Sequence, residues 1–419
     1  MANPCPETYK KRVVDPYVDE LLTQLPALLV IGPRAVGKST TIARRARSII
    51  RLDREGEAAA FVADPDAALR GLAEPVLLDE WQVVPGVLGA VRRSIEADRR
   101  PNRFLVTGSV RAELDNEVWP GTGRLTRVAM YPMSIREQLG LTAGATFFDT
   151  LANGEQLSVP AAPPDLRGYV ELALRSGFPD PALHLSGKPR EAWLESYIED
   201  LLTHDVEQLE DTRTKRHDRR LLRNYFEAYA LNSAGIAQHK TIFGAATLNR
   251  KTADRYESLL TDLLVVEQIP SWRSNRLRRL VHQPKRYLID PALIATALRL
   301  DVQGVLGDGD LLGRVLDTFV AAQLRPQLAP SDTRPRLYHL RTEGGRQEVD
   351  LLAELAGQRV IGMEVKAGAA PERADAKHLI WLRDKIGGRF VAGIVFHTGP
   401  RPFELDERIT AAPIAALWG

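Results

Sequence analysis

Short apolar runs alternate with helix-like segments along the first third of the chain. The runs lie at 27–31, 48–53, 76–78 and 103–109, and stretches typical of helices separate them. Strands that are apolar throughout belong to parallel sheets that helices cover on both faces. The pattern therefore predicts an α/β domain with a parallel sheet, to which we assign residues 1–140.

After residue 140 the pattern becomes mainly helical. Residues 141–165 are rich in Gly, Ala, Pro and Thr and show little periodicity, which is typical of a linker. Apolar positions at helical spacing return at 169–176, 190–209 and 219–231. We assign residues 141–220 to a linker with a helical segment.

Residues 221–300 combine short helices with a hairpin. Residues 248–264 have a helical pattern, and strands at 265–269 and 285–289 flank a basic turn. This order is typical of a winged helix, whose second helix can lie in the major groove of DNA. Basic side chains of the hairpin would then contact phosphates: Arg273, Arg276, Arg278, Arg279, Lys285 and Arg286. A winged helix that only packs between domains is the alternative.

Residues 301–419 predict a second α/β domain. A helix at 311–324 precedes strands that include 348–352 and 359–367, and a helix at 373–386 and a strand at 390–396 follow. Helix, three strands, helix and strand is the core layout of the PD-(D/E)xK nucleases. The fold class that we expect is thus multidomain α/β, with a P-loop NTPase sheet, a helical linker, a winged helix and a PD-(D/E)xK-like domain.

Composition places this chain among globular proteins and excludes few partners. Its 419 residues exceed one ordinary core, and 44% of them are hydrophobic. The 56 basic and 54 acidic residues give a net charge of +2, so a nucleic acid would have to bind local basic patches. A single cysteine, Cys5, excludes an intramolecular disulfide. With no apolar run of 18 residues and no signal-peptide core, we expect a cytoplasmic protein without a membrane partner.

The sequence GPRAVGKS fits the phosphate-loop pattern G-x-x-x-x-G-K-[ST]. It follows the apolar run 27–31 and precedes a helix-like stretch. Its backbone N–H groups can surround phosphate oxygens, while Lys38 reaches the β- and γ-phosphates and Ser39 holds Mg²⁺. The predicted ATP-binding residues are Gly32, Pro33, Arg34, Ala35, Val36, Gly37, Lys38, Ser39 and Thr40.

Two carboxylates end the apolar run at 76–78. Asp79 would complete the Mg²⁺ shell, usually through water, and Glu80 would orient or deprotonate an attacking water. A kinase that phosphorylates a bound alcohol does not need the second acid, so the pair favours ATP hydrolysis.

Further polar residues extend the predicted ATPase site. Thr107 or Ser109, at the end of the next strand, could sense the γ-phosphate or position the water, although Ser109 could equally cap a helix. Arg124, in a glycine-flanked turn, would stabilise transition-state charge in its own subunit or in a neighbour's, which would require a homo-oligomer.

A second group of charged residues lies in the last hundred residues. Period-two alternation puts Glu364 and Lys366 on one face of a strand, and a hairpin would bring Asp350 beside Glu364. Asp317, on the preceding helix, would point at the same place. These three carboxylates would hold Mg²⁺, and Lys366 would orient the nucleophile. The alternative is a structural ion pair in which Lys366 neutralises Glu364 and Asp350.

The order of these motifs resembles prokaryotic AAA-like ATPases that carry a C-terminal domain of unknown function. GPRAVGKST, VLLDEWQ, FLVTGS and GTGRL resemble the ATPase half of that family, and SGFPDP, PKRYLIDPAL, RQEVDLL and GMEVKAG resemble its C-terminal half. The resemblance implies phosphate and Mg²⁺ binding by Lys38 and Ser39, hydrolysis by Asp79 and Glu80, and sensing by Thr107 and Arg124. Where the family usually has Glu-Asn, this chain has Asp317-Thr318.

Two hypotheses of function follow. In the first, ATP hydrolysis drives a nucleic-acid enzyme whose winged helix binds DNA, with RNA also open, and whose C-terminal residues cut phosphodiesters. In the second, the chain is an ATP-operated switch or assembly protein whose C-terminal half binds a partner and has no nuclease activity.

Overall fold

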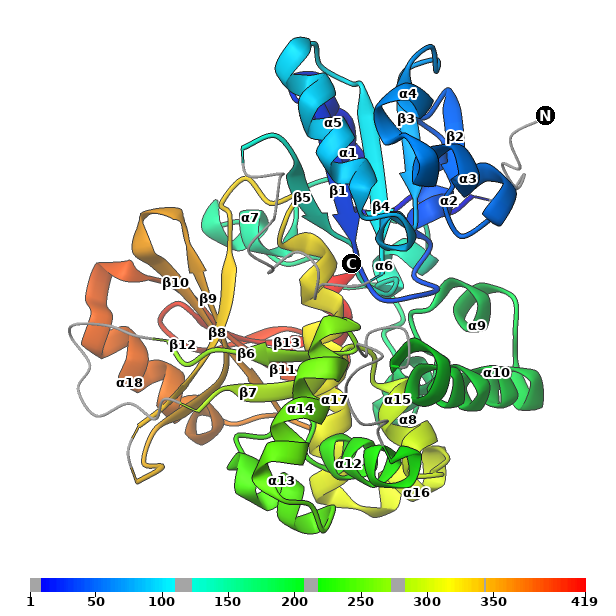
Figure 1. Ribbon diagram of the computed structural model, residues 1–419. Coiled ribbons are helices and arrows are strands. Elements are labelled where there is room, and N and C mark those ends of the chain that lie inside the picture. Colours follow the sequence, from blue (N-terminus) through cyan, green and yellow to red (C-terminus); the bar gives the residue numbers. More distant parts are fainter. Residues whose placement is uncertain (1–8, 110–122, 207–217, 273–282, 343) are drawn as a thin grey trace. The chain divides into compact units, whose positions relative to one another are not determined.

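The computed structural model describes residues 9–109, 123–206, 218–272, 283–342 and 344–419. Its contacts divide the chain into two compact units (Figure 1). Unit 1 comprises residues 1–131 with 261–264, and unit 2 comprises 132–260 with 265–419. The finer division into four parts that we made from the sequence stays a prediction.

Unit 1 is built on a five-stranded sheet in the order β2-β3-β4-β1-β5. All of its paired strands run parallel, which confirms the predicted parallel-sheet α/β domain. The strands are β1 (Ala27–Ile31), β2 (Ser48–Arg51), β3 (Val76–Asp79), β4 (Phe104–Gly108) and β5 (Thr126–Ala129). The helices are α1 (Asp15–Leu22), α2 (Lys38–Ala43), α3 (Glu55–Ala63), α4 (Pro65–Leu69) and α5 (Gly86–Ala97).

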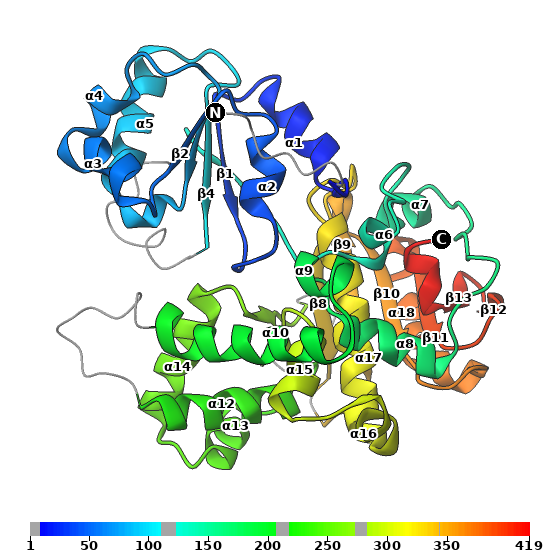
Figure 2. The same ribbon diagram turned by 90° about the vertical axis from the view of Figure 1, so that its right-hand side faces the viewer.

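Helices cover both faces of this sheet. Figure 2 shows α3, α4 and α5 on one side and α1 and α2 on the other. Leu29 and Val106 pack toward the first group in one core cluster with Phe61 and Val91. Every residue of β1, β3 and β4 is buried, because alternate side chains enter the two covered faces. The apolar runs seen in the sequence are therefore the central strands.

Unit 2 is helical in its first part. Its helices before residue 265 are α6 (Ile135–Gln138), α7 (Phe147–Ala152), α8 (Leu166–Arg175), α9 (Pro179–Leu183), α10 (Gly187–Asp200), α12 (Arg219–Leu231), α13 (His239–Ala245) and α14 (Arg250–Asp262). The antiparallel strands β6 (Val266–Ile269) and β7 (Lys285–Leu288) follow. Three helices and a hairpin are thus in the predicted order, whereas residues 273–282, with four of the six predicted phosphate-binding residues, lie outside the described residues. The winged-helix assignment remains a prediction.

The rest of unit 2 is a mixed six-stranded sheet with helices. Its strand order is β12-β13-β11-β10-β9-β8. The strands are β8 (Arg336–Arg341), β9 (Glu348–Leu355), β10 (Arg359–Val365), β11 (Phe390–His397), β12 (Phe403–Asp406) and β13 (Ile409–Pro413). The helices of this part are α15 (Ala292–Ala297), α16 (Val302–Gly307), α17 (Gly309–Leu324) and α18 (Lys377–Ile386).

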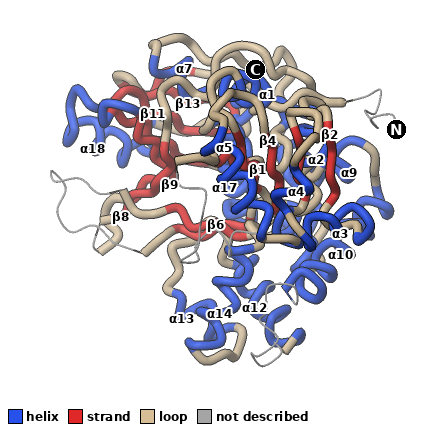
Figure 3. The backbone as a smooth tube through the Cα atoms, turned by 45° about the horizontal axis from the view of Figure 1, so that its top comes forward, coloured by secondary structure: helices blue, strands red, loops and turns tan. Residues whose placement is uncertain are grey.

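Helix α18 packs on this sheet (Figure 3). Leu379 and Leu382 of α18 share a core cluster with Leu352, Val360 and Val395 from β9, β10 and β11. The antiparallel pairing of Met363 with Leu351 makes the next residues, Glu364 and Asp350, neighbours across the two strands. Within the described ranges, no helix has the length and apolarity that crossing a bilayer would require.

Candidate functional site

The phosphate loop connects β1 to α2 and has a tightly constrained backbone. A Cβ on Gly32 would lie 2.2 Å from the carbonyl oxygen of Met130, so glycine alone fits there. Gly37 has a φ of 89°, in the left-handed region that favours glycine. Ala35 also has a positive φ, of 60°, which costs backbone energy at a residue with a Cβ. Pro33 and Val36 are buried, Arg34 and Ser39 are half-buried, and Ala35 and Thr40 are exposed.

The side chain of Lys38 folds back onto this loop. Its ammonium group donates hydrogen bonds to the carbonyl oxygens of Gly32 at 3.0 Å and Pro33 at 2.9 Å. Burial lowers the pKa of Lys38 to about 8, although the Glu80 and Asp79 carboxylates oppose this shift. A buried cation held mainly by neutral carbonyl groups would be better satisfied by an anion, and a phosphate group supplies one.

Three predicted residues meet at the carboxyl ends of the strands. Ser39 Oγ donates a hydrogen bond to Asp79 Oδ1 at 2.8 Å, and the buried hydroxyl of Thr107 donates to the same oxygen. Asp79 ends β3 and Thr107 lies in the neighbouring strand β4, so parallel pairing brings them to one edge. The arrangement supplies hydroxyl and carboxylate oxygens, which are the donors that Mg²⁺ prefers.

Glu80 is held beside this group by two polar side chains. It has a φ of 56°, and its Oε2 accepts hydrogen bonds from Ser109 Oγ at 3.1 Å and from Gln82 Nε2. Gln82 Nε2 also lies 3.3 Å from Ser109 Oγ. Ser109 thus contacts the second acid, whereas the residues that it was expected to cap lie outside the described ranges. The sequence analysis missed Gln82, although it lies two residues after Glu80.

Arg12 is a second contact that the sequence analysis missed. This buried guanidinium group donates hydrogen bonds to the carbonyl oxygens of Val36 at 2.8 Å and Tyr131 at 2.6 Å. Its own backbone N–H donates to Asp15 Oδ2 at 2.7 Å. Arg12 therefore braces the phosphate loop from a segment that carries no recognisable motif.

Arg124 does not join the residues at the strand ends. It forms an ion pair with Glu96 at 3.3 Å, near the end of α5. Because Leu28 pairs with Thr126 in parallel register, residue 124 lies beyond the amino end of β5, at the edge opposite the phosphate loop. This position corrects the expectation that Arg124 acts on the nucleotide of its own subunit, and it leaves the expectation for a neighbouring subunit untested.

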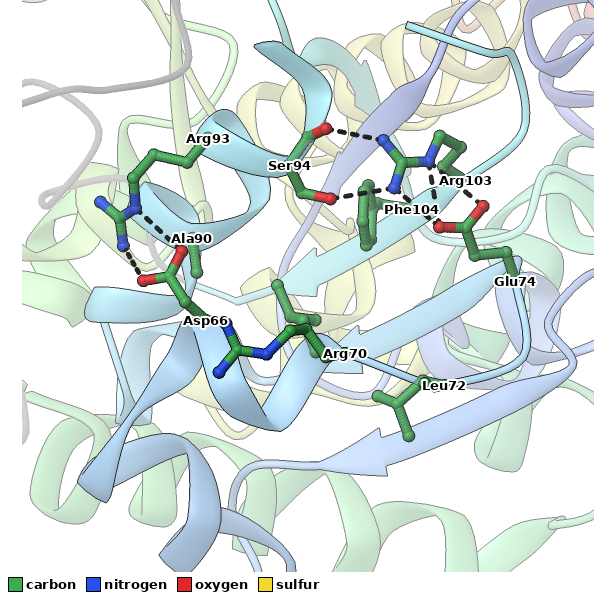
Figure 4. A pocket seen from close by; sticks show the side chains of 11 residues that line it. Asp66, Arg70, Leu72, Glu74, Ala90, Arg93, Ser94, Arg103 and Phe104 are labelled. Atoms are coloured by element: carbon green, nitrogen blue, oxygen red, sulfur yellow. Dashed lines mark hydrogen bonds and ion pairs between the residues drawn. The ribbon is translucent and has the colours of Figure 1, made fainter. Parts of the chain in front are cut away.

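A cavity of about 330 Å³ also opens at this opposite edge of unit 1 (Figure 4). Four of its five charged lining residues form two ion pairs, and the fifth is Arg70. Arg93 contacts Asp66, and Arg103 Nη2 lies 2.8 Å from Glu74 Oε1 and 2.9 Å from Ser94 Oγ. These pairs satisfy the charges internally, and the phosphate loop lies at the other end of the strands, so this cavity is not the nucleotide site.

The C-terminal carboxylates converge, but on a lysine. Lys285 Nζ lies 2.5 Å from Asp317 Oδ2, 3.4 Å from Asp350 Oδ1 and 3.2 Å from the Asp350 carbonyl oxygen. Tyr287 donates to Asp317 Oδ1 at 2.9 Å, and the Val365 N–H donates to Asp350 Oδ2 at 3.1 Å. We call Lys285, Asp317, Asp350, Glu364 and Lys366 the acidic cluster.

Burial and the neighbouring charges shift the pKa values of the side chains in this cluster. Burial lowers the pKa of Lys285, but Asp317, Tyr287 and Asp350 together outweigh burial and raise this pKa well above its ordinary value. Burial raises the pKa of Asp317 to about 6. Burial and the Asp350 carboxylate raise the pKa of Glu364 well above its ordinary value. Lys366 Nζ lies 3.4 Å from Glu364 Oε2.

These contacts correct two predictions. Asp317, Asp350 and Glu364 were expected to hold a metal, yet within the described ranges no set of three or more His, Cys, Asp or Glu side chains is arranged to bind one. Lys285 and Arg286 were expected to contact DNA phosphates, but both are buried. Arg286 donates instead to Glu257 Oε1 at 2.7 Å and to the Ala237 carbonyl oxygen at 2.9 Å. The partners of both basic residues come from distant parts of the sequence.

Family models match three parts of the chain. Residues 24–139 match an AAA domain, residues 166–304 match a domain of unknown function (DUF8612), and residues 312–417 match another domain of unknown function (DUF4143). The first match covers the parallel sheet and the phosphate loop. It supports an AAA-like ATPase for unit 1 and assigns no activity to unit 2.

Similar proteins have been recorded in two mycobacteria. The uncharacterized proteins Rv2008c of Mycobacterium tuberculosis and Mb2031c of Mycobacterium bovis are each 29% identical over 406 residues, which is 94% of this chain and 81% of theirs. Their names state no activity.

The similar solved structures superpose poorly on this chain as a whole. The Walker-type ATPase of Pyrococcus abyssi is 14% identical with a TM-score of 0.42, over 72% of this chain and 99% of that one. RuvB of Thermotoga maritima is 17% identical with a TM-score of 0.29, over 69% of this chain and 94% of that one. Similarities with TM-scores this low do not indicate an activity for this chain. The parallel sheet, the phosphate loop and the match over residues 24–139 together make unit 1 similar to AAA-like P-loop domains.

Proposed function

We propose that this chain hydrolyses ATP at the carboxyl edge of the unit 1 sheet and uses the cycle to switch the state of a partner-binding unit 2. The observation that carries the proposal is the meeting of Ser39, Asp79 and Thr107 on one carboxylate oxygen, beside the buried Lys38. A chance glycine-rich turn would have no reason to place these groups together.

Each residue has a distinct part in the proposed reaction. The loop N–H groups and Lys38 bind the β- and γ-phosphates. Ser39 and Asp79 are the residues that would hold Mg²⁺, which neutralises phosphate charge when it is bound. Thr107 orients Asp79 through its hydrogen bond. Glu80 accepts the proton of the attacking water, and Ser109 and Gln82 hold its carboxylate in place.

These groups form hydrogen bonds within unit 1 that a nucleotide would exchange. Lys38 bonds two carbonyl groups of its own loop, and Ser39 bonds Asp79. A phosphate would replace the carbonyl partners of Lys38, and Mg²⁺, if bound by Ser39 and Asp79, would take the place of the hydrogen bond between them. Binding of nucleotide therefore rearranges contacts within the loop, which is what a switch requires.

For unit 2 we favour partner binding over cleavage. The residues expected to hold a catalytic metal instead surround Lys285, which fits the second of our two hypotheses. DNA is the partner that we propose, on the strength of the basic residues between 273 and 279 in the sequence. If they contact DNA, each phosphate contact contributes about −0.9 to the slope of log affinity against log salt.

An assay of the purified full-length chain tests the proposal. ATP hydrolysis would be measured with and without duplex DNA for the wild type, for Lys38→Ala and for Lys188→Ala, an exposed lysine as matched control. We expect hydrolysis by the wild type and the control and its loss in Lys38→Ala. Wild-type protein that binds ATP but does not turn it over would refute ATP hydrolysis, and metal-dependent cutting of DNA would refute the assignment of unit 2.

A further inference from the structure

Lys285 lies at the centre of the acidic cluster and has as many oxygen neighbours as it has N–H donors. An ammonium group has three N–H donors and no acceptor. Three oxygens surround this one, namely Asp317 Oδ2, Asp350 Oδ1 and the Asp350 carbonyl oxygen. Lys285 is 2% exposed, so these oxygens rather than water satisfy it. Because this cation is buried and all of its donors are paired, its contacts belong to the packed interior and differ from a transient ion pair on the surface.

Each oxygen of the Asp317 and Asp350 carboxylates already accepts a hydrogen bond. Asp317 uses one oxygen for Lys285 and the other for Tyr287. Asp350 uses one for Lys285 and the other for the Val365 N–H. Among the described residues, no donor reaches Glu364 Oε1, although Glu364 is 3% exposed. A divalent cation needs about six oxygen ligands, and it would have to displace Lys285 to find them here.

The net charge of the cluster leads to the same conclusion. Asp317, Asp350 and Glu364 can supply at most three negative charges, and Lys285 and Lys366, which contact them, supply two positive charges. Adding a divalent cation while both lysines remain would leave an excess of positive charge in a buried place, which is unfavourable. Without Lys285, the same carboxylates would carry a net negative charge.

We propose that Lys285 is the resident cation of this cluster, and that its ammonium group takes the position of the divalent metal which the carboxylates would otherwise bind. The lysine thereby joins β7 to α17 and to β9 and fastens the hairpin to the mixed sheet. This inference does not depend on ATP hydrolysis, since all of the residues involved lie in unit 2.

Binding of Mn²⁺ to the nucleotide-free, full-length chain tests this assignment. Electron paramagnetic resonance would measure free Mn²⁺ in titrations of the wild type, Lys285→Ala, Lys285→Ala/Asp350→Asn and Lys377→Ala, an exposed lysine of α18 as control. We expect Lys285→Ala to bind one more Mn²⁺ than the wild type, at least about tenfold more tightly than any wild-type site, because one positive charge has been removed. Adding Asp350→Asn should abolish this gain, and Lys377→Ala should behave as the wild type does.

Two results would overturn the proposal. The first is a Mn²⁺ site that the wild type has and that the single variant Asp350→Asn lacks. This result would show that the metal binds while Lys285 is present. The second is a folded Lys285→Ala protein, as judged by circular dichroism, without the additional site. If Lys285→Ala fails to fold alone, refolding in the presence of Mn²⁺ but not of NaCl at equal ionic strength supports the proposal. Failure to refold in Mn²⁺ contradicts it, because the metal would then be unable to replace the lysine.

Discussion

Ser39 and Asp79, which are 40 residues apart in the sequence, share a hydrogen bond of 2.8 Å at the carboxyl edge of the unit 1 sheet. Parallel pairing of β1, β4 and β3 brings the two chain segments together. Thr107 bonds the same Asp79 oxygen. The geometry presents a hydroxyl and a carboxylate side by side without any rearrangement of the strands, and it makes the neighbouring Glu80 the residue to test next.

Glu80→Gln should stop ATP hydrolysis while preserving ATP binding. Glutamine keeps the size of the side chain and removes the proton acceptor, so we expect turnover to fall by about a hundredfold or more. Affinity for a fluorescent ATP analogue should stay close to that of the wild type, because Lys38 and Ser39 are intact. Glu55→Gln, at an exposed position of α3, is the matched control. Turnover by Glu80→Gln at the wild-type rate would show that another group activates the water.

Arg124→Ala tests whether the enzyme works as a homo-oligomer. If Arg124 serves the nucleotide of a neighbouring subunit, the variant should bind ATP normally and turn it over slowly. Mixing it with Lys38→Ala protein should restore part of the activity, because some hybrid sites combine an intact loop with an intact arginine. Glu96→Ala removes the ion-pair partner of Arg124 and serves as control. Turnover by a monomer at a rate per molecule that is independent of protein concentration would contradict this role.

His339 should make the stability of unit 2 sensitive to mild acid. Burial, aided by nearby Lys285 and opposed by the hydrogen bond to the Gln283 carbonyl group, lowers its pKa to about 4. The unfolded chain protonates this histidine near pH 6.5 and the folded chain does not. Its stabilising effect is therefore complete above pH 6.5 and is lost as the pH falls through about 4, to an extent on the order of 3 kcal/mol.

Urea unfolding between pH 7 and pH 4 would measure this effect. His339→Gln keeps a donor for the Gln283 carbonyl oxygen, which lies 2.8 Å from His339 Nε2, but it has no such titration. The unfolding midpoint of this variant should vary less with pH than that of the wild type. His184→Gln, at an exposed position, should retain the wild-type slope. Equal slopes in all three proteins would assign the acid sensitivity to other groups.

Asp290→Ala should destabilise unit 2 strongly. The buried carboxylate accepts hydrogen bonds from the Gly177 N–H at 2.6 Å, Ser176 Oγ at 3.0 Å and the Ala292 N–H at 2.9 Å. Removing it leaves three donors unsatisfied, at a cost on the order of 3 kcal/mol or more. Ser176→Ala removes one of these donors but leaves the Phe178 N–H, which donates to Ser176 Oγ at 3.1 Å, without this acceptor, so it should cost less, about 2 kcal/mol. A thermal midpoint of Asp290→Ala no lower than that of Ser176→Ala would contradict this account.

The sequence by itself determined the features that depend on neighbours along the chain. The phosphate loop, the acids after 76–78 and the apolar strands are local patterns, because backbone conformation and strand burial follow from a few consecutive residues. The edge at which Ser39, Asp79 and Thr107 meet was also predictable, since parallel strands bring their carboxyl ends together. Strand alternation likewise predicted that Asp350 would lie beside Glu364.

Only the tertiary structure decided which partner each charged side chain has. Lys285 was expected to contact DNA from a hairpin, yet it lies between Asp317 and Asp350, which are 32 and 65 residues away in the sequence. Arg12 braces the phosphate loop from a segment without a motif. A long basic side chain binds whichever carboxylate or carbonyl group the packing of distant elements brings within about 3 Å. The residues next to it in the sequence do not indicate which group that is.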